Sequence, residues 1–234
     1  MKCAPETRAT SATDNDPQTA EDTAHVLTKF GAEHHVREFR SRGILHMSRL
    51  QYFSSKEEDG GPLRYDRWEG VDVVIQPGKG SISIDGRHFE LAGPGLLRLG
   101  GPPTPHVFCA YALTDRRAKV AVEDGRCVVD GRVAGMGTHA VVILDVPGFL
   151  ERVERTLQGM SLGYRYGLVE YVSDQHSGDL GAFRKRDSYG YQSEFRLAVN
   201  GYPDDIFRAE VGSLEDISTL AEAKHAVELE VTFG

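Results

Sequence analysis

Hydrophobic and polar positions alternate between residues 191 and 199, in the last quarter of the chain. An extended segment would carry on one side Tyr191, Ser193, Phe195, Leu197 and Val199, and on the other Gln192, Glu194 and Arg196. We therefore predict that residues 185–199 form a turn followed by a long strand whose apolar side faces a core. Gln192 and Glu194 would then stand roughly 6.5–7 Å apart on the opposite side, rigidly presented to a polar ligand.

The same alternation also fits a strand whose polar side is solvated. Glu194 and Arg196 would then be surface charges, as most Glu and Arg side chains are. Periodicity alone favours this simpler arrangement. A functional role for the strand therefore needs support from the rest of the chain.

The pattern near residue 25 predicts a strand, a helix and a second strand. Short apolar runs at residues 26–30 and 44–53 are the strand candidates. Between them, Ala32, Val36 and Phe39 recur at helical spacing and predict a helix over residues 32–42. Gly43 follows at the position where a left-handed residue commonly ends a helix.

From residue 71 onward, strand patterns separated by turn residues dominate the chain. The predicted strands are residues 71–76, 81–85, 88–91, 96–99, 106–113, 118–124, 126–130, 139–146, 166–172, 206–211 and 226–233. Two further helices are predicted, over residues 147–158 with Pro147 in the first turn and over residues 213–223 with Ser213 as cap. These alternations favour an α+β fold.

Residues 54–70 are polar and rich in turn residues, yet they contain the only tryptophan, Trp68. A fully solvated loop has no need of Trp68 and Tyr65, so part of this segment is expected to pack on the protein. Long irregular segments in a folded region commonly carry function. We therefore predict that residues 54–70 border a ligand cleft, with Arg67 or Glu69 facing it.

Composition supports a single folded domain that follows an N-terminal tail. The chain has 234 residues, of which 40% are hydrophobic and 26% charged, which is enough for a core. Residues 1–24 are rich in Thr, Ala, Asp, Glu and Pro and show no apolar periodicity, so we predict a disordered tail there. Residues 25–234 are predicted to form one domain.

Charge and cysteine content exclude several classes of protein. The net charge of −8 argues against a general nucleic-acid-binding surface. No apolar run is long enough to span a membrane, and the N-terminal segment lacks the apolar stretch of a secretory signal. The three cysteines lack the spacing of a disulfide framework or a zinc site. These features predict a cytoplasmic protein without a bound metal.

The chain resembles an uncharacterised bacterial family over most of residues 25–199. The resemblance is carried by the strands VLTKF and ILHMSRLQYFSS and by the motifs Asp66-Arg67-Trp68-Glu69, Phe108-Cys109-Ala110-Tyr111 and Tyr191-Gln192-Ser193-Glu194-Phe195-Arg196. The same order of elements resembles the ADP-ribosyltransferase-like fold. This resemblance implies an α+β domain with mixed, mostly antiparallel sheets and about three helices.

In that fold a first strand carries a polar residue that meets NAD, and a late strand carries a catalytic Glu. Many members have Gln or Glu two residues before that Glu. The resemblance assigns these roles to Lys29, Glu194 and Gln192. Members usually have Arg or His in the place of Lys29, and residues 81–83 match their Ser-Thr-Ser-like strand only weakly.

The resemblance implies NAD as the substrate. Cleavage of the nicotinamide–ribose bond builds positive charge on the ribose, which the Glu194 carboxylate would stabilise while Gln192 holds the acceptor. The other implied NAD-binding residues are Lys29, Arg67 and Arg186 at the pyrophosphate, Tyr52 and Tyr111 stacking on a ring, and Glu69 and Arg196 at the pocket.

Each of these residues also has a structural alternative. Lys29 could form a salt bridge at a sheet edge, and Tyr52 and Tyr111 could pack in the core. Arg67 and Arg186 could be solvated loop charges. Asp66 and Glu69 could instead cap the loop by accepting backbone hydrogen bonds.

Three classes of function stay open at this point. The first is NAD-dependent ADP-ribosyl transfer or NAD glycohydrolysis, as in a toxin or antiphage effector, which the family resemblance implies. The second is a nucleotide-binding module on the same fold without catalysis. The third is a protein-interaction or structural domain. The resemblance implies no particular macromolecular acceptor.

Overall fold

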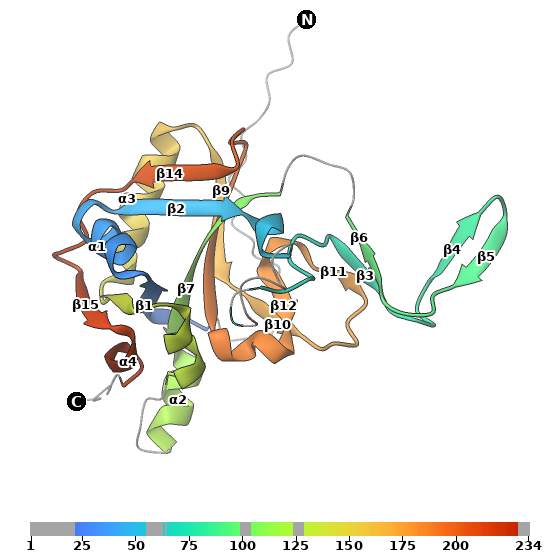
Figure 1. Cartoon of the computed structure of the whole chain (residues 1–234), viewed down its shortest axis with the longest axis horizontal. Helices are drawn as coiled ribbons and strands as arrows, with labels where there is room; N and C mark the ends of the chain where they lie inside the picture. The colour runs from blue at the N-terminus through green and yellow to red at the C-terminus, as the bar shows by residue number, and fades with distance from the viewer. Residues whose placement is uncertain (1–21, 55–62, 64, 99–103, 124–128, 229–234) are drawn as a thin grey trace, which may run out of the picture.

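The structure is a computed structural model that describes residues 22–54, 63, 65–98, 104–123 and 129–228. It is an α+β structure in which nearly all strand pairs are antiparallel, which confirms the predicted fold class at this level (Figure 1). The predicted N-terminal tail lies outside the described residues except for its last three. No helix in the described ranges is both long and apolar enough to cross a membrane.

The largest sheet has eight strands. Six of them lie side by side in the order β14 (Ile206–Glu210), β2 (Ile44–Arg49), β7 (His106–Thr114), β1 (Ala24–Gly31), β8 (His139–Ile143) and β15 (Ser218–Glu222). The other two are β13 (Glu194–Asn200), which pairs with β7, and β9 (Gly163–Leu168), which pairs with β13. Because β7 pairs with three neighbours, it is the central strand of this sheet.

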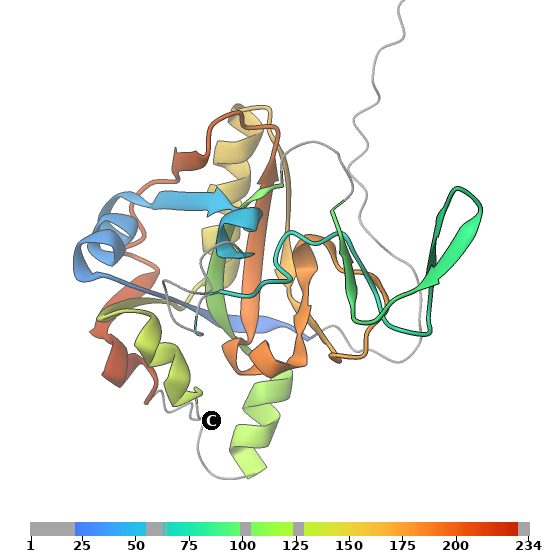
Figure 2. The same cartoon turned by 45° about the vertical axis from the view of Figure 1, so that its right-hand side comes forward.

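The sheet forks along one edge of β7. The other edge of β7 pairs with β13 continuously, from Glu194 opposite Tyr111 to Val199 opposite His106. On the forked edge, β1 pairs only with residues 111–114 of β7 and β2 only with residues 106–107. The strands β1 and β2 therefore diverge, and residues 108–110 of β7 lie between them (Figures 1 and 2).

Two helices cover the main core. The helix α1 (Glu33–Arg42) contributes Val36 and Phe39, and α3 (Val146–Gly159) contributes an apolar stripe that includes Phe149. The ring of Phe39 lies 5.3 Å from that of Phe108 and 6.2 Å from that of Phe149, measured between ring centroids. Both helices match sequence predictions to within one or two residues.

Gly43 ends α1 as predicted. Its φ of 69° is left-handed, and its N–H donates to the carbonyl of Phe39. A Cβ on Gly43 would lie 2.1 Å from the carbonyl oxygen of Gly212, so only glycine fits between α1 and β2.

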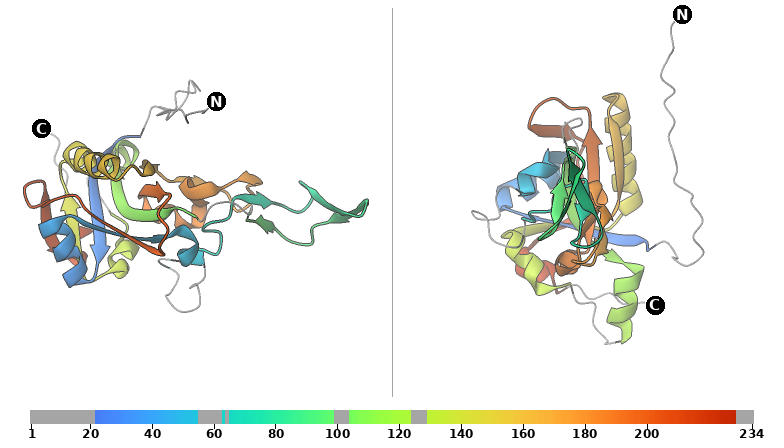
Figure 3. Two further views of the ribbon diagram at one scale, coloured as in Figure 1. Left: turned by 90° about the horizontal axis from the view of Figure 1, so that it is seen from above. Right: turned by 90° about the vertical axis from the view of Figure 1, so that its right-hand side faces the viewer.

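Two smaller sheets extend from the body. One contains β11 (Gly178–Asp179), β3 (Val73–Ile75) and β6 (Gly95–Leu97). The other is a hairpin of β4 (Ser81–Ile84) and β5 (Arg87–Glu90), joined by the predicted turn at Asp85 and Gly86. This hairpin stands well away from the rest of the protein (Figures 1 and 3).

Several short segments complete the chain. The parallel pair is β10 (Glu170–Val172) with β12 (Arg184–Arg186). The 3-10 segments are η1 (Leu50–Ser54), η2 (Gly131–Met136), η3 (Gly181–Phe183) and η4 (Asp187–Gln192), and the remaining helices are α2 (Asp115–Glu123) and α4 (Ala223–Ala226).

Two predicted elements are wrong, and a third is shorter than predicted. The predicted strand over residues 118–124 is wrong, because residues 118–123 belong to α2; a run this short fits both periodicities. Residues 213–223 do not form a helix; they contain β15, which pairs with β8 across five residues. The turn and long strand predicted over residues 185–199 correspond to η4 and β13, but the strand begins at Glu194 and the alternating residues Tyr191 and Gln192 belong to η4. The predicted final strand over residues 226–233 lies largely outside the described residues.

Candidate functional site

A cavity of about 950 Å³ opens where β1 and β2 diverge from β7. Its wall includes side chains from β1, β2, β7, α1 and η1 and from the described part of the predicted loop 54–70. Seven of the nine predicted site residues line it: Lys29, Tyr52, Glu69, Tyr111, Gln192, Glu194 and Arg196. Segments distant in the sequence are thus brought together around one concave site.

Two carboxylates and two cations form a buried network on this wall. Arg196 donates to both oxygens of Glu69, at 2.8 and 3.2 Å, and its Nε donates to Oε1 of Glu194 at 2.7 Å. The Nζ of Lys185 lies 3.2 Å from Oε2 of Glu194 and 3.2 Å from Oε1 of Glu69. The charges of the four groups balance, which is the arrangement that makes buried ions tolerable.

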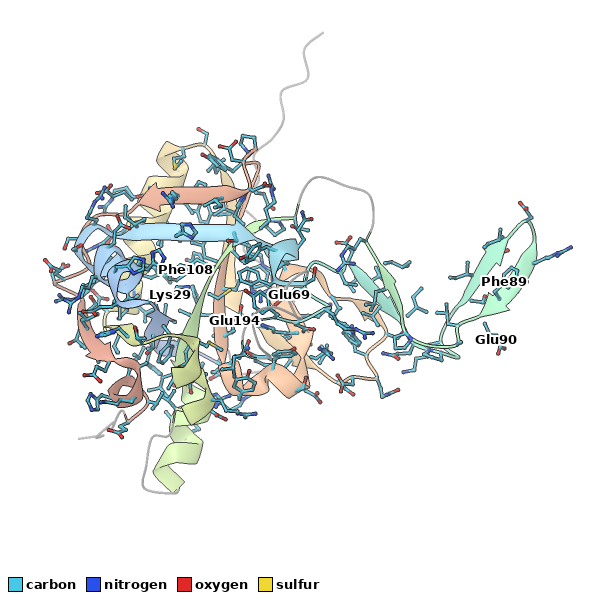
Figure 4. All side chains as sticks on the ribbon, in the orientation of Figure 1. Lys29, Glu69, Phe89, Glu90, Phe108 and Glu194 are labelled. Carbon is cyan, nitrogen blue, oxygen red and sulfur yellow. The ribbon has the colours of Figure 1, made fainter. Side chains whose placement is uncertain are left out.

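The interpretation of this strand face as solvated is therefore wrong. Glu194 is 5% exposed and Arg196 is 1% exposed, so neither is a surface charge. The core side of β13 is as predicted, because Phe195, Leu197 and Val199 all lie in the main hydrophobic cluster. Figure 4 shows Glu194 and Glu69 in the body of the protein, far from the hairpin.

The network keeps Glu194 ionised. Burial alone would raise its pKa, but Arg196 and Lys185 outweigh that effect and lower the pKa to about 2. Burial opposes the charge of Lys185 in the same way, and Glu194 and Glu69 raise the pKa of Lys185 above its ordinary value. The Glu194 carboxylate is thus a fixed negative charge at neutral pH rather than a proton donor.

The backbone at Ser193 determines how Gln192 and Glu194 are presented. Ser193 has a left-handed conformation, with φ 40° and ψ 54°, between η4 and β13. Its hydroxyl donates to the carbonyl of Ala112 at 2.7 Å. Because of this kink, Gln192 belongs to η4 and Glu194 begins β13. The prediction that both lie on one side of a single continuous strand is therefore wrong.

Gln192 and Glu194 nevertheless converge on one group. The Nζ of Lys185 donates to Oε1 of Gln192 at 2.8 Å and to Oε2 of Glu194 at 3.2 Å. The amide nitrogen of Gln192 donates to the carbonyl of Leu63 at 2.8 Å, so Gln192 also ties the predicted loop to the network. Gln192 therefore positions its neighbours as well as lining the cavity.

Lys29 lies in the fork of the sheet. Its Nζ donates to the carbonyl of Cys109 at 2.8 Å and lies 4.5 Å from the ring centroid of Phe108 (Figure 4). Cys109 belongs to the stretch of β7 that pairs with neither β1 nor β2. The side chain of Lys29 thus donates to a β7 carbonyl that receives no backbone hydrogen bond from β1 or β2, and it brings a positive charge to the cavity.

The tyrosines differ in their exposure. Tyr52 is 40% exposed and meets Phe53 edge to face, with 5.5 Å between ring centroids. Tyr111 is 5% exposed and packs in a second hydrophobic cluster with Phe30. Both line the cavity, and Tyr52 has the more accessible ring for stacking.

Arg67 and Arg186 do not line the cavity. Arg67 is exposed. Arg186 donates to Oδ1 of Asp66 at 2.8 Å and lies over the ring of Trp68, so it anchors the loop. Asp66 also accepts from the backbone N–H of Trp68, which is the structural alternative considered for this residue.

Lys185 and Cys109 also line the cavity, and the sequence predictions did not include them among the site residues. Lys185 is 5% exposed, but in the run Arg184-Lys185-Arg186 it looks like one of three surface charges. Only the alternation of β12 distinguishes it, because its side chain faces away from those of its two neighbours. Burial and the nearby Glu194 raise the pKa of the Cys109 thiol to about 12, so Cys109 is not an activated nucleophile.

Within the described ranges, no three His, Cys, Asp or Glu side chains gather closely enough to hold a metal ion. No protein-family model matches the chain. No curated protein and no solved structure matches it significantly either. Evidence for function therefore comes from the geometry and charge of the site.

Proposed function

We propose that this protein binds NAD in the cavity at the fork and cleaves the bond between nicotinamide and ribose, transferring ADP-ribose to an acceptor or to water. The observation that carries the proposal is the Glu194 carboxylate, which is ionised, buried and fixed on the cavity wall. A carboxylate held in this way stabilises developing positive charge without reorganising first.

The reaction requires a single displacement at C1′ of the ribose. The bond from C1′ to the nicotinamide nitrogen breaks, and its electron pair stays on nicotinamide. An acceptor oxygen or a water forms the new bond to C1′ and loses its proton to the solvent. Glu194 would accept a hydrogen bond from the ribose 2′-hydroxyl and stabilise the oxocarbenium-like transition state.

The rest of the cavity supplies binding groups of the expected kinds. Lys29 brings a cation to one wall for the pyrophosphate, and the accessible ring of Tyr52 can stack on a base. The divergence of β1 and β2 across from β13 supports an ADP-ribosyltransferase-like arrangement. On this proposal the protein acts in the cytoplasm, and a role as a toxin or antiphage effector rests on the sequence resemblance alone.

A second candidate is nucleotide binding without cleavage. It is favoured by the contacts of Glu194, whose Oε1 is held by Arg196 and whose Oε2 is held by Lys185. A carboxylate whose charge is compensated in this way stabilises an oxocarbenium ion less than a carboxylate that lacks such partners. The two candidates differ in whether bound NAD is consumed.

The test is two parallel incubations. NAD labelled in the nicotinamide reports release of free nicotinamide, and NAD labelled in the adenosine reports transfer of ADP-ribose to macromolecules. Glu194→Gln should keep NAD binding and reduce turnover at least tenfold, or ~1.4 kcal/mol of barrier. The matched control is Glu170→Gln, because Glu170 is exposed and pairs only with Arg184 among the described residues. Binding without turnover by the wild-type protein would favour the second candidate, and absence of binding would leave a protein-interaction domain.

A further inference from the structure

The hairpin of β4 and β5 has one apolar and one polar face. Cross-strand partners share a face, and here Ile82 pairs with Phe89 and Ile84 with Arg87. The other face carries Ser81, Ser83, His88 and Glu90. The apolar face is open to solvent: Ile82 is 42% exposed, Ile84 is 59% exposed and Phe89 is 49% exposed.

Nothing in the described part of the chain covers this face. The strands β4 and β5 pair only with each other there, so both outer edges of the hairpin lack strand partners. Figures 1 and 3 show the hairpin projecting from the small sheet of β3 and β6, and Figure 4 shows Phe89 and Glu90 far from the body. A two-stranded hairpin alone in water is marginally stable and gains stability when a further layer covers its apolar face.

The distribution of charge between the hairpin and the rest of the chain indicates what covers the apolar face of the hairpin. The chain carries a net charge of −8, so two copies repel each other at most surfaces. Residues 77–93, which contain the hairpin, carry two positive charges, Lys79 and Arg87, and two negative charges, Asp85 and Glu90, so their net charge is zero. The projecting segment thus carries no net charge and is held away from an acidic body.

We propose that this hairpin is a self-association arm, in which the apolar faces of two hairpins from two copies of this chain pack against each other about a two-fold axis. Ile82, Ile84 and Phe89 of one copy would then cover the same residues of the other. Arg87 shares the apolar face, so its guanidinium can lie over the partner's Phe89 ring. Because residues 77–93 carry no net charge, they offer an acidic patch or an anionic membrane no net electrostatic attraction.

The arm is small, which sets the expected strength of the dimer. Stable interfaces bury about 800 Å² on each partner, and a hairpin with three large apolar side chains offers less than that. We expect a reversible dimer with a dissociation constant in the micromolar range. Because the contact is apolar, raising the salt concentration should preserve or strengthen it, since salt screens the repulsion between the acidic bodies.

The experiment is sedimentation velocity on the full chain, from low to high micromolar concentration. The wild-type protein should change from monomer to dimer over this range. The double variant Ile82→Thr, Phe89→Thr should stay monomeric, because Thr keeps strand propensity and removes the apolar face. The control Ile206→Thr, which replaces a residue 47% exposed on the edge strand β14, should dimerise as the wild type does.

A second measurement tests which face is in contact. Under mild oxidation, Phe89→Cys should give a cross-linked dimer above the level of the wild-type protein, whereas Ser83→Cys on the polar face should not. A wild-type protein that is monomeric at every concentration would overturn the proposal. A dimer that persists in the double variant, or that is cross-linked equally from both faces, would also overturn it.

Discussion

Arg196 and Glu69 form a two-point ion pair inside the protein although 127 residues separate them in the sequence. Arg196 is on β13 and is 1% exposed, and Glu69 is 4% exposed in the irregular segment that lines part of the cavity. This pair joins the central sheet to the irregular segment. The cavity wall and the stability of the fold therefore depend on the same residues.

Arg196→Met should destabilise the protein by about 3–5 kcal/mol, because it leaves Glu69 and Glu194 with only Lys185 to balance two buried charges. Urea unfolding followed by circular dichroism measures this. The control is Arg155→Met, which removes an exposed pair with Glu151 on α3 and should change stability by less than about 0.5 kcal/mol. Equal effects of the two substitutions would contradict a buried network.

Replacing both partners tests whether the cost comes from the uncompensated charge. The double variant Arg196→Met, Glu69→Leu should be less destabilised than the sum of the two single variants by more than about 0.5 kcal/mol. A double variant whose effect equals that sum would mean that the two residues act independently.

Acid should weaken the fold through Glu194. The pKa of this carboxyl is about 2 in the folded protein against an ordinary value of 4.5, so below pH 4.5 the unfolded chain binds more protons than the folded one. The contribution of Glu194 is therefore complete above pH 4.5 and is lost as the pH falls toward 2. Unfolding free energies of the wild type and of Glu194→Gln should converge over that interval, and a constant difference would contradict the assignment.

The sequence predicts which way a side chain faces only where the alternation or the helical spacing continues unbroken. For β13 it places Phe195 and Leu197 in the core and Glu194 on the opposite side, and for α1 the helical spacing and Gly43 predict both the face and the end. It does not reveal that Lys185 is buried, because burial of a lysine depends on two carboxylates from distant segments. The kink at Ser193 has no local signal either, since a left-handed serine is an exception to residue preference.

Lys29 offers a test of the cavity that does not depend on catalysis. Lys29→Met removes the charge and the bond to the Cys109 carbonyl, and it should weaken NAD binding at least tenfold, or ~1.4 kcal/mol. Lys29→Arg keeps the charge and should recover part of the affinity. The control Lys119→Met changes an exposed lysine on α2 and should leave binding unchanged. Isothermal titration calorimetry measures all three, and unaltered affinity in Lys29→Met would place the ligand elsewhere.

Ser193 gives the last prediction, because its backbone conformation and its hydroxyl can be tested separately. Both Ser193→Ala and Ser193→Gly lose the hydrogen bond to the Ala112 carbonyl, which should cost about 1 kcal/mol. Only alanine keeps a Cβ in the left-handed conformation at φ 40°, so the glycine variant should be the more stable of the two by about 1 kcal/mol.

A β-branched residue tests the same conformation more severely. Ser193→Val should be the least stable of the three, because a branched side chain fits poorly at positive φ. If the kink is what brings Gln192 and Glu194 to Lys185, Ser193→Gly should also keep NAD binding, whereas Ser193→Val should lose it in protein that is still folded. Equal stability of the alanine and glycine variants would show that Ser193 is not held left-handed, and full binding by the valine variant would show that the site does not need the kink.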